Sequence, residues 1–245
     1  MKYTNSQHYC SRPDYPASLF EALSELAPNL DLAWDVGTGT GQAALGLARH
    51  FEKVIASDSS AEQIGHAKAH QRIEYQVSSA EQTDFRAASV SLTTVAAALH
   101  WFDFEAFCAE VARVLCPGGI LAVWTYTDQS SFSPSVDQVL KALTDDVYAF
   151  AQSTHEGGTA RYQMLNFPFD EVETSLFQDM TLNKIWAYSD LVSVLRSWSA
   201  VQAFDQDQGG DIVSHYTKAL AQAWGNPAER RSVSWRVVGR VLRKG

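Results

Sequence analysis

The sequence predicts an α/β domain built on a doubly wound, mostly parallel β-sheet. Short apolar runs occur at residues 32–36, 53–57, 73–77, 90–98 and 120–124, and the segments between most of them have helical spacing. The fourth run is almost wholly apolar or β-branched, which is typical of a central parallel strand. A glycine-rich turn follows the first run and opens a helix. Alternation of strand and helix in this order favours a parallel sheet.

The glycine-rich turn is the strongest local signal for a ligand site. Gly37, Gly39 and Gly41 follow the first strand, with Thr38 between them, and an alanine-rich helix comes next. A ligand can lie against a backbone only where no Cβ intervenes, and glycine also tolerates positive φ. The start of the helix offers free N–H groups. We therefore expect a cofactor at the carboxyl end of this strand.

The glycines alone do not choose between two cofactors. Gly39, Gly41 and Ala44 satisfy the GxGxxG/A pattern of dinucleotide sites, and Asp58 follows at about the ~20 residues such a site needs for a ribose contact. Asp35, just before the turn, would repel a pyrophosphate. S-adenosylmethionine (SAM) has no phosphate and carries a sulfonium and an α-ammonium. Asp35 thus favours SAM, with a nicotinamide-dependent oxidoreductase and a catalytically silent SAM-binding module as alternatives.

Five stretches carry a family resemblance over most of the chain. AWDVGTGTGQAA resembles motif I of the class I SAM-dependent methyltransferases of the type 11 group. A branch related to the trans-aconitate methyltransferases is similar, in order, at VIASDSS, ALHWFDF, RVLCPGGILAVW and LRSWSAV. The resemblance implies a Rossmann-like, seven-stranded sheet whose last strand, residues 232–242, is antiparallel. It also implies SAM as cofactor, S-adenosylhomocysteine as product, and a small-molecule acceptor such as a carboxylic acid.

The resemblance also assigns cofactor contacts beyond the glycine turn. It implies that Asp58 accepts hydrogen bonds from the ribose hydroxyls, and that Arg12 holds the methionine carboxylate, unless Arg12 is an ordinary surface residue. Relatives often have an aspartate where Ser79 stands, so the adenine contact falls to Ser79, Glu81 or the backbone of Ala80. The full set of predicted cofactor residues is Asp35, Gly37, Thr38, Gly39, Gly41, Asp58, Ser59, Ser79, Ala80, Glu81, Ala97 and Arg12.

Acceptor residues are predicted where the fourth strand ends. His100 and Trp101 follow that strand, and ligands of open α/β sheets sit beyond the carboxyl ends of strands. Imidazole groups in general titrate near neutrality, so His100 is our candidate general base, with a histidine fixed in the wall as the alternative. Trp101 either lines the sulfonium or fills the core. The predicted substrate-binding residues, including cations for an acidic acceptor, are Tyr9, Tyr15, Trp101, Arg161, Arg196 and Trp198.

We expect one methyltransferase domain over residues 1–245, with a lid over residues 1–28 and an inserted cap over residues 126–176. Helices are predicted at residues 17–26 and from Pro134 to about Phe150, and the cap is expected to cover the site. A further helix carries Leu191 to Trp198 by spacing. Ser59 and Glu62 match a capping box at the start of the helix after the second strand.

The amino-acid composition limits which binding partners and which cellular compartment we expect. A formal net charge of −9 argues against nucleic acid as a partner. Three scattered cysteines without a CxxC pair suggest reduced thiols in a cytoplasm, and neither a signal peptide nor a membrane span is indicated. His66 and His70 are four apart but lack the glutamate of HExxH, so we expect no metal site. The protein is expected to be a monomer or homodimer.

Overall fold

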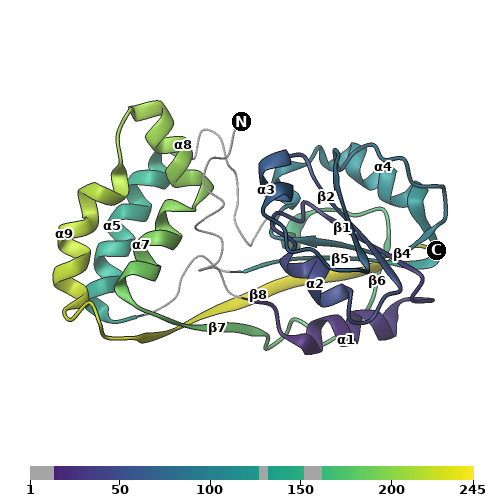
Figure 1. Ribbon diagram of the computed structural model, residues 1–245, viewed down its shortest axis with the longest axis horizontal. Coiled ribbons are helices and arrows are strands. Elements are labelled where there is room, and N and C mark those ends of the chain that lie inside the picture. Colours follow the sequence, from purple (N-terminus) through teal and green to yellow (C-terminus); the bar gives the residue numbers. More distant parts are fainter. Residues whose placement is uncertain (1–13, 127–131, 152–161) are drawn as a thin grey trace.

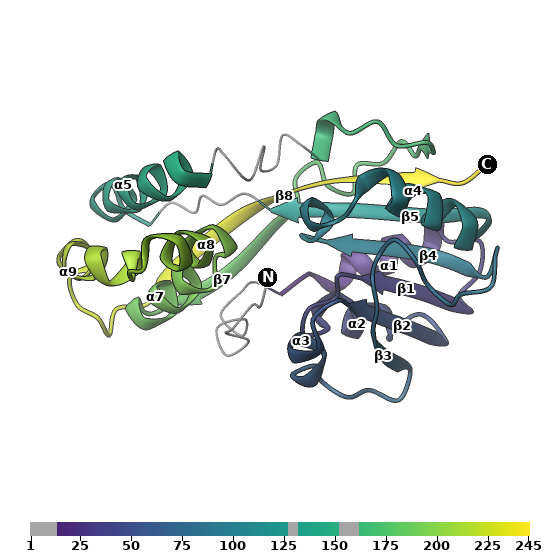
Figure 2. The ribbon, with the colours of Figure 1, turned by 90° about the horizontal axis from the view of Figure 1, so that it is seen from above.

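The computed structural model describes residues 14–126, 132–151 and 162–245. It has two parts, an α/β lobe that holds the sheet and a helical lobe at one end (Figure 1). Strands β7 (Thr181–Trp186) and β8 (Arg231–Arg243) run between them, as the view from above shows (Figure 2). The chain crosses between the lobes more than once, so the helical lobe is assembled from segments far apart in sequence.

The α/β lobe contains the predicted parallel sheet. The order of its strands is β3-β2-β1-β4-β5-β8-β6, with β7 also paired to β8. Strands β1 to β5 are parallel, and β8 runs antiparallel to β5, as expected for the last strand. The described strands are β1 (Leu32–Val36), β2 (Lys53–Asp58), β3 (Ile73–Val77), β4 (Val90–Ala96), β5 (Leu115–Tyr126), β6 (Asp170–Glu171), β7 (Thr181–Trp186) and β8 (Arg231–Arg243).

The expected strand number was wrong, because the described sheet has eight strands rather than seven. The last strand is long enough to pair with two short ones. Its carboxyl end pairs with β6 and its amino end with β7. The amino-terminal half of β8 thereby forms a ribbon with β7 that reaches from the sheet to the helical lobe (Figure 2).

Helices cover both faces of the sheet. α1 (Ala17–Leu26) and α2 (Gln42–Leu47) contribute Leu19 and Leu47 to an apolar cluster on one face. α4 (Phe104–Val114) packs against the other face, where a second cluster contains Trp34 and Phe107. Figure 1 shows α4 on the opposite side of the sheet from α1 and α2. The predicted helix at residues 17–26 is confirmed.

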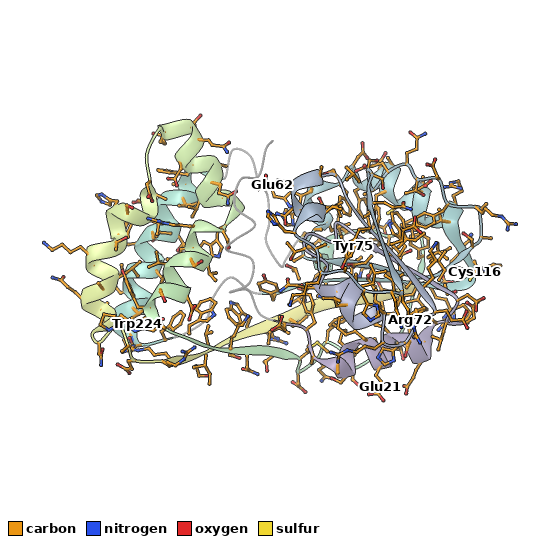
Figure 3. The ribbon with its side chains drawn as sticks, in the orientation of Figure 1. Glu21, Glu62, Arg72, Tyr75, Cys116 and Trp224 are labelled. Carbon is orange, nitrogen blue, oxygen red and sulfur yellow. The ribbon has the colours of Figure 1, made fainter. Side chains whose placement is uncertain are left out.

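The helical lobe combines one helix of the predicted insertion with three later ones. α5 (Pro134–Ala151) packs against α8 (Ser199–Gln208) and α9 (Ile212–Trp224), and α7 (Tyr188–Arg196) packs against α9. Trp224 lies at its base, where Phe132 approaches it with 5.5 Å between ring centroids (Figure 3). Helical spacing in the sequence predicted α5, but not its grouping with α8 and α9.

Three local predictions near the site were wrong. β4 ends at Ala96 rather than Ala98, because Ala97 has a φ of +55° and turns the chain out of the strand. The helix after β2, α3 (Ala61–Gly65), is capped by Ser60 rather than Ser59: the Ser60 Oγ accepts the Gln63 N–H at 3.3 Å. Trp198 lies beyond α7 and begins α8 instead.

Candidate active site

The glycine turn joins β1 to α2, and its three glycines have different surroundings. All have positive φ, at +67°, +58° and +87° for Gly37, Gly39 and Gly41. A Cβ at Gly37 would lie 2.5 Å from the Ala98 Cβ, and one at Gly41 would lie 2.3 Å from the Tyr75 hydroxyl. A Cβ at Gly39 would meet nothing closer than the Gln63 Oε1, at 4.0 Å. Two glycines thus allow close packing, whereas the third leaves backbone open to a ligand.

Asp35 lies beneath the turn and is completely buried. Its two carboxylate oxygens accept hydrogen bonds from the hydroxyls of Thr38 and Thr94, the latter at 2.7 Å. Burial raises the pKa of Asp35 to about 6, against the effect of these hydrogen bonds, which lower it. The carboxylate therefore ties the glycine turn to β4. It places negative charge under the turn without itself reaching open space.

Asp58 stands at the end of β2 and closes the other side of the turn. Its Oδ2 accepts the Gly39 N–H at 2.9 Å, and its Oδ1 accepts the Ser60 N–H at 2.9 Å. An ionised carboxylate has about four acceptor positions, so each oxygen retains capacity for a ligand hydroxyl. Ser59, next in the chain, is exposed. The predicted ribose acid thus directly neighbours the open face of Gly39.

The loop after β3 carries the predicted adenine residues. The Ser79 Oγ accepts the Glu81 N–H at 3.1 Å, and Ala80 is buried. The Glu81 carboxylate accepts the Asp103 N–H at 3.1 Å and so ties the loop to the residue that caps α4. A second tie follows, where Glu110 of α4 accepts the Thr83 N–H at 2.8 Å. Hydrogen bonds to α4 and to its capping residue therefore fix this loop.

The end of β4 packs directly on the glycine turn. Ala97 adopts left-handed backbone geometry, which is uncommon outside glycine and concentrates at functional sites, and its N–H bonds to the Trp124 carbonyl at 2.8 Å. The short 3₁₀ turn Leu99–Trp101 then presents His100 and Trp101, whose ring centroids are 4.7 Å apart. Trp101 is 40% exposed. We call this 3₁₀ turn the histidine turn; the residues on either side of it, Ala98 and Phe102, lie against Gly37 of the glycine turn.

The predicted substrate residues are not gathered in one place by the described contacts. Tyr9, Arg12 and Arg161 lie outside the described residues. Tyr15 packs edge-on against Trp124, with 5.4 Å between ring centroids. In the helical lobe, Trp198 is partly buried against the apolar core.

Arg196 already has an anionic partner in the structure. Its Nη2 lies 3.1 Å from the Asp211 carboxylate and donates to the Ser214 hydroxyl at 2.9 Å. Asp211 in turn caps α9 through the Ser214 N–H. The Arg196 guanidinium therefore stabilises the helical lobe in this structure, and its predicted role toward an acidic acceptor stays a prediction.

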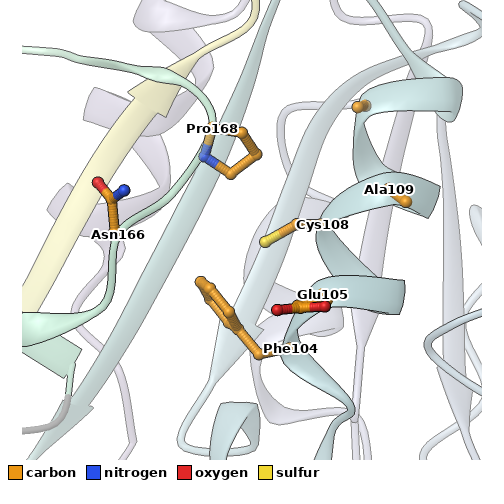
Figure 4. Close-up of a pocket in the computed structure, with 7 residues that line it drawn as sticks. Phe104, Glu105, Cys108, Ala109, Asn166 and Pro168 are labelled. Carbon is orange, nitrogen blue, oxygen red and sulfur yellow. The ribbon is translucent and has the colours of Figure 1, made fainter.

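A separate hollow lies between α4 and the segment that precedes β6. It encloses about 560 Å³ and is shown in Figure 4, with Cys108 and Phe104 facing Pro168. Burial raises the pKa of the Cys108 thiol to about 11, which keeps it protonated and weakly reactive. The lining contains no residue of the glycine turn. Its members are Phe104, Glu105, Cys108, Ala109, Ala112, Asn166 and Pro168.

Comparison with known proteins identifies the family. The methyltransferase domain model matches residues 34–123. A Dictyostelium discoideum protein named as a candidate methyltransferase is 30% identical, over 87% of this chain and 81% of its own length. A solved structure from Anaeromyxobacter dehalogenans, described as a candidate type II methyltransferase, is 37% identical with a TM-score of 0.79, covering 95% of this chain and 97% of that one. The chain is a class I SAM-dependent methyltransferase.

The name of a third relative states SAM as the cofactor of that protein. A Saccharomyces cerevisiae protein named as a candidate SAM-dependent methyltransferase is 27% identical over 93% of this chain and 84% of its own length. The cofactor of the methyltransferase is SAM. None of these three names states an acceptor. Over the ranges that the structure describes, no cluster of His, Cys, Asp or Glu is placed to hold a metal ion, and each helix is too short or too polar to cross a bilayer.

One further residue of the methyltransferase borders the open face of Gly39. Gln63 is almost fully buried, and its Oε1 faces the position that a Gly39 Cβ would take. No sequence pattern selects Gln63, because a glutamine in the first turn of a short helix is usually a surface residue. Only the burial of its side chain distinguishes it.

Proposed function

We propose that the methyltransferase transfers a methyl group to a small carboxylic acid, at a carboxylate oxygen. The observation that carries the location of this reaction is the contact between the glycine turn and Ala98, the residue that directly precedes the histidine turn. Gly37 allows Ala98 to approach so closely that a Cβ at Gly37 would lie 2.5 Å from the Ala98 Cβ. This contact supports a reaction site where the glycine turn meets the chain that leads into His100 and Trp101.

The cofactor residues have distinct proposed roles. SAM supplies an electrophilic methyl group on a sulfonium. Gly39 presents bare backbone against it, and Asp58 accepts from the ribose hydroxyls while its Oδ2 holds the Gly39 N–H at 2.9 Å. Asp35 supplies negative charge beneath the turn, which favours a cationic ligand. Arg12, outside the described residues, is proposed to bind the methionine carboxylate.

For the acceptor, alignment and exclusion of water are the main requirements of in-line transfer. Trp101, with 40% of its surface exposed, is the aromatic residue that we propose to line the acceptor. A carboxylic acid has a pKa of about 4 and has already lost its proton at neutral pH, so this reaction needs no general base. In this proposal His100 contacts the acceptor and orients it. Arg12 and Arg161 are the candidate partners of an acidic acceptor, as the resemblance implies.

The proposal is tested with SAM that carries a radioactive methyl group. The protein is incubated with a panel of small mono-, di- and tricarboxylic acids, and with the matching amides and alcohols as controls. We expect label to enter a product of the acids alone. Mild alkali should then release the label as methanol, because esters hydrolyse under conditions that leave ethers and N-methyl groups intact. Label that enters the amides or alcohols, or that resists alkali, would contradict a carboxylate acceptor.

The variant His100→Ala distinguishes an orienting role of His100 from a role as general base. We expect it to raise KM for the acid about tenfold, since one contact to a charged acceptor is lost, while affinity for S-adenosylhomocysteine stays unchanged. The pH–rate profiles of the two proteins should then differ only by a constant factor. A fall in kcat of about 100-fold together with loss of the acid limb of the profile would instead show a general base and an acceptor that must lose a proton.

A further inference from the structure

Gln63 combines deep burial with an unmatched polar atom. It lies in α3, where its backbone N–H is bonded to the Ser60 Oγ at 3.3 Å. Gln63 is only 5% exposed, and its side-chain oxygen, Oε1, has no hydrogen-bond partner in the described part of the chain. Buried amide oxygens are nearly always hydrogen-bonded, because an unmatched one loses its water without replacement. This atom therefore needs an explanation.

The surroundings of the Oε1 point to a ligand. It lies 4.0 Å from the position of a Cβ at Gly39, the one face of the glycine turn that the protein does not fill. The same glycine donates its N–H to the Asp58 Oδ2 at 2.9 Å. Two acceptor oxygens, one charged and one neutral, thus flank the same open backbone. A ligand with hydroxyl donors matches this pair.

We propose that the Gln63 Oε1 accepts a hydrogen bond from a ribose hydroxyl of bound SAM, beside the bonds made by Asp58. This inference rests on the proposed ribose role of Asp58. SAM has three kinds of donor, namely the ribose hydroxyls, the adenine amino group and the α-ammonium. The hydroxyls are the donors that an acid at the end of β2 receives, and the Oε1 borders the same glycine as that acid.

An unmatched atom kept for a ligand has a signature that a structural residue lacks. Gln63→Met keeps a similar length but removes the amide, so the free protein should be at least as stable as the wild type while its affinity for the cofactor falls. A residue that only supports the fold would lose stability instead. Gln63→Leu serves as a second variant if the methionine packs poorly.

Thr93→Val is the matched control. Thr93 lies in β4, is fully buried, and its hydroxyl is likewise without a partner in the described residues. It pairs with Trp34 in the sheet and has no contact with Gly39. Replacement by valine, which has the same shape, should raise or preserve the melting temperature. It should leave the affinity for S-adenosylhomocysteine unchanged.

The test is calorimetric titration of the three proteins with S-adenosylhomocysteine and with its 2′-deoxy and 3′-deoxy analogues, together with melting of the free proteins. We expect Gln63→Met to bind S-adenosylhomocysteine about tenfold more weakly than wild type, and to lose this disadvantage with one of the two deoxy analogues. Equal affinity of wild type and variant would overturn the proposal. So would a tenfold loss that persists with both analogues, or a lower melting temperature without an affinity change. If the variant Asp58→Asn binds S-adenosylhomocysteine as tightly as the wild type does, the ribose assignment on which the inference rests would be overturned instead.

Discussion

Gly39→Ala is expected to weaken binding of S-adenosylhomocysteine by about 100-fold or more while the protein stays folded. The new methyl group would project into the one face of the glycine turn that the protein leaves open, with only the Gln63 Oε1 at 4.0 Å. Because the fold does not need that space, the steric cost arises only when the cofactor occupies it. The positive φ of +58° adds a backbone strain of about 1 kcal/mol for a residue with a Cβ. Calorimetric titration and urea unfolding measure the two effects separately.

Gly209→Ala controls for the backbone strain. Gly209 ends α8 with a φ of +65°, and a Cβ there would meet nothing within 4 Å. This variant should lose about as much stability, roughly 1 kcal/mol, yet bind S-adenosylhomocysteine like the wild type. If Gly39→Ala keeps its affinity within about threefold of wild type, a difference of about 0.6 kcal/mol, the cofactor does not lie against this turn.

Asp35 is expected to give the protein a stability that declines as pH rises from about 4 to about 6. Burial raises the pKa of Asp35 to about 6 from an ordinary 3.8, so in this window the folded state holds the proton that the unfolded state has released. Folding then requires the uptake of a proton, which becomes more costly as pH rises, and the stability lost reaches about 3 kcal/mol once both pKa values are passed. Above about pH 6.5 this contribution no longer changes.

Asp35→Asn isolates this contribution from the other titrating groups. Asparagine stays neutral and remains able to hydrogen-bond Thr38 and Thr94, whose hydroxyls either donate or accept. The free energy of unfolding, measured in urea from pH 4.5 to 7.5, should fall with pH more steeply in the wild type than in the variant. Parallel curves would mean that the pKa of Asp35 is the same in the folded and the unfolded state, and would contradict the rise that burial causes.

Repetitive elements and their order could be predicted from the sequence because local patterns determine them. The apolar runs and the glycine turn were sufficient for the parallel sheet, and the apolar face of residues 17–26 was sufficient for α1. The predictions were wrong where the backbone conformation, rather than the residue type, determines where an element begins or ends. Ala97 turns left-handed and ends β4 early, although alanine is not typical of that conformation. Adjacent serines also do not reveal which one caps α3.

The site was predictable where its residues follow strands, and not where distant segments meet. Asp58 and the glycine turn adjoin because β1 and β2 are neighbours, which the strand order implies. The ion pair between Arg196 and Asp211 joins α7 to the start of α9, and no local sequence pattern predicts it. The contact of Glu81 with Asp103 is similar, since it depends on how the β3 loop meets α4.

The central claim is that SAM lies against the glycine turn with its methyl group directed toward the histidine turn. A crystal structure of the protein with S-adenosylhomocysteine tests this most directly. We predict ribose hydroxyls within hydrogen-bonding distance of the Asp58 carboxylate, bare Gly39 backbone against the ligand, and the sulfur facing His100 and Trp101. Electron density for the ligand in the hollow beside Cys108, or a ribose that Asp58 does not contact, would contradict the account.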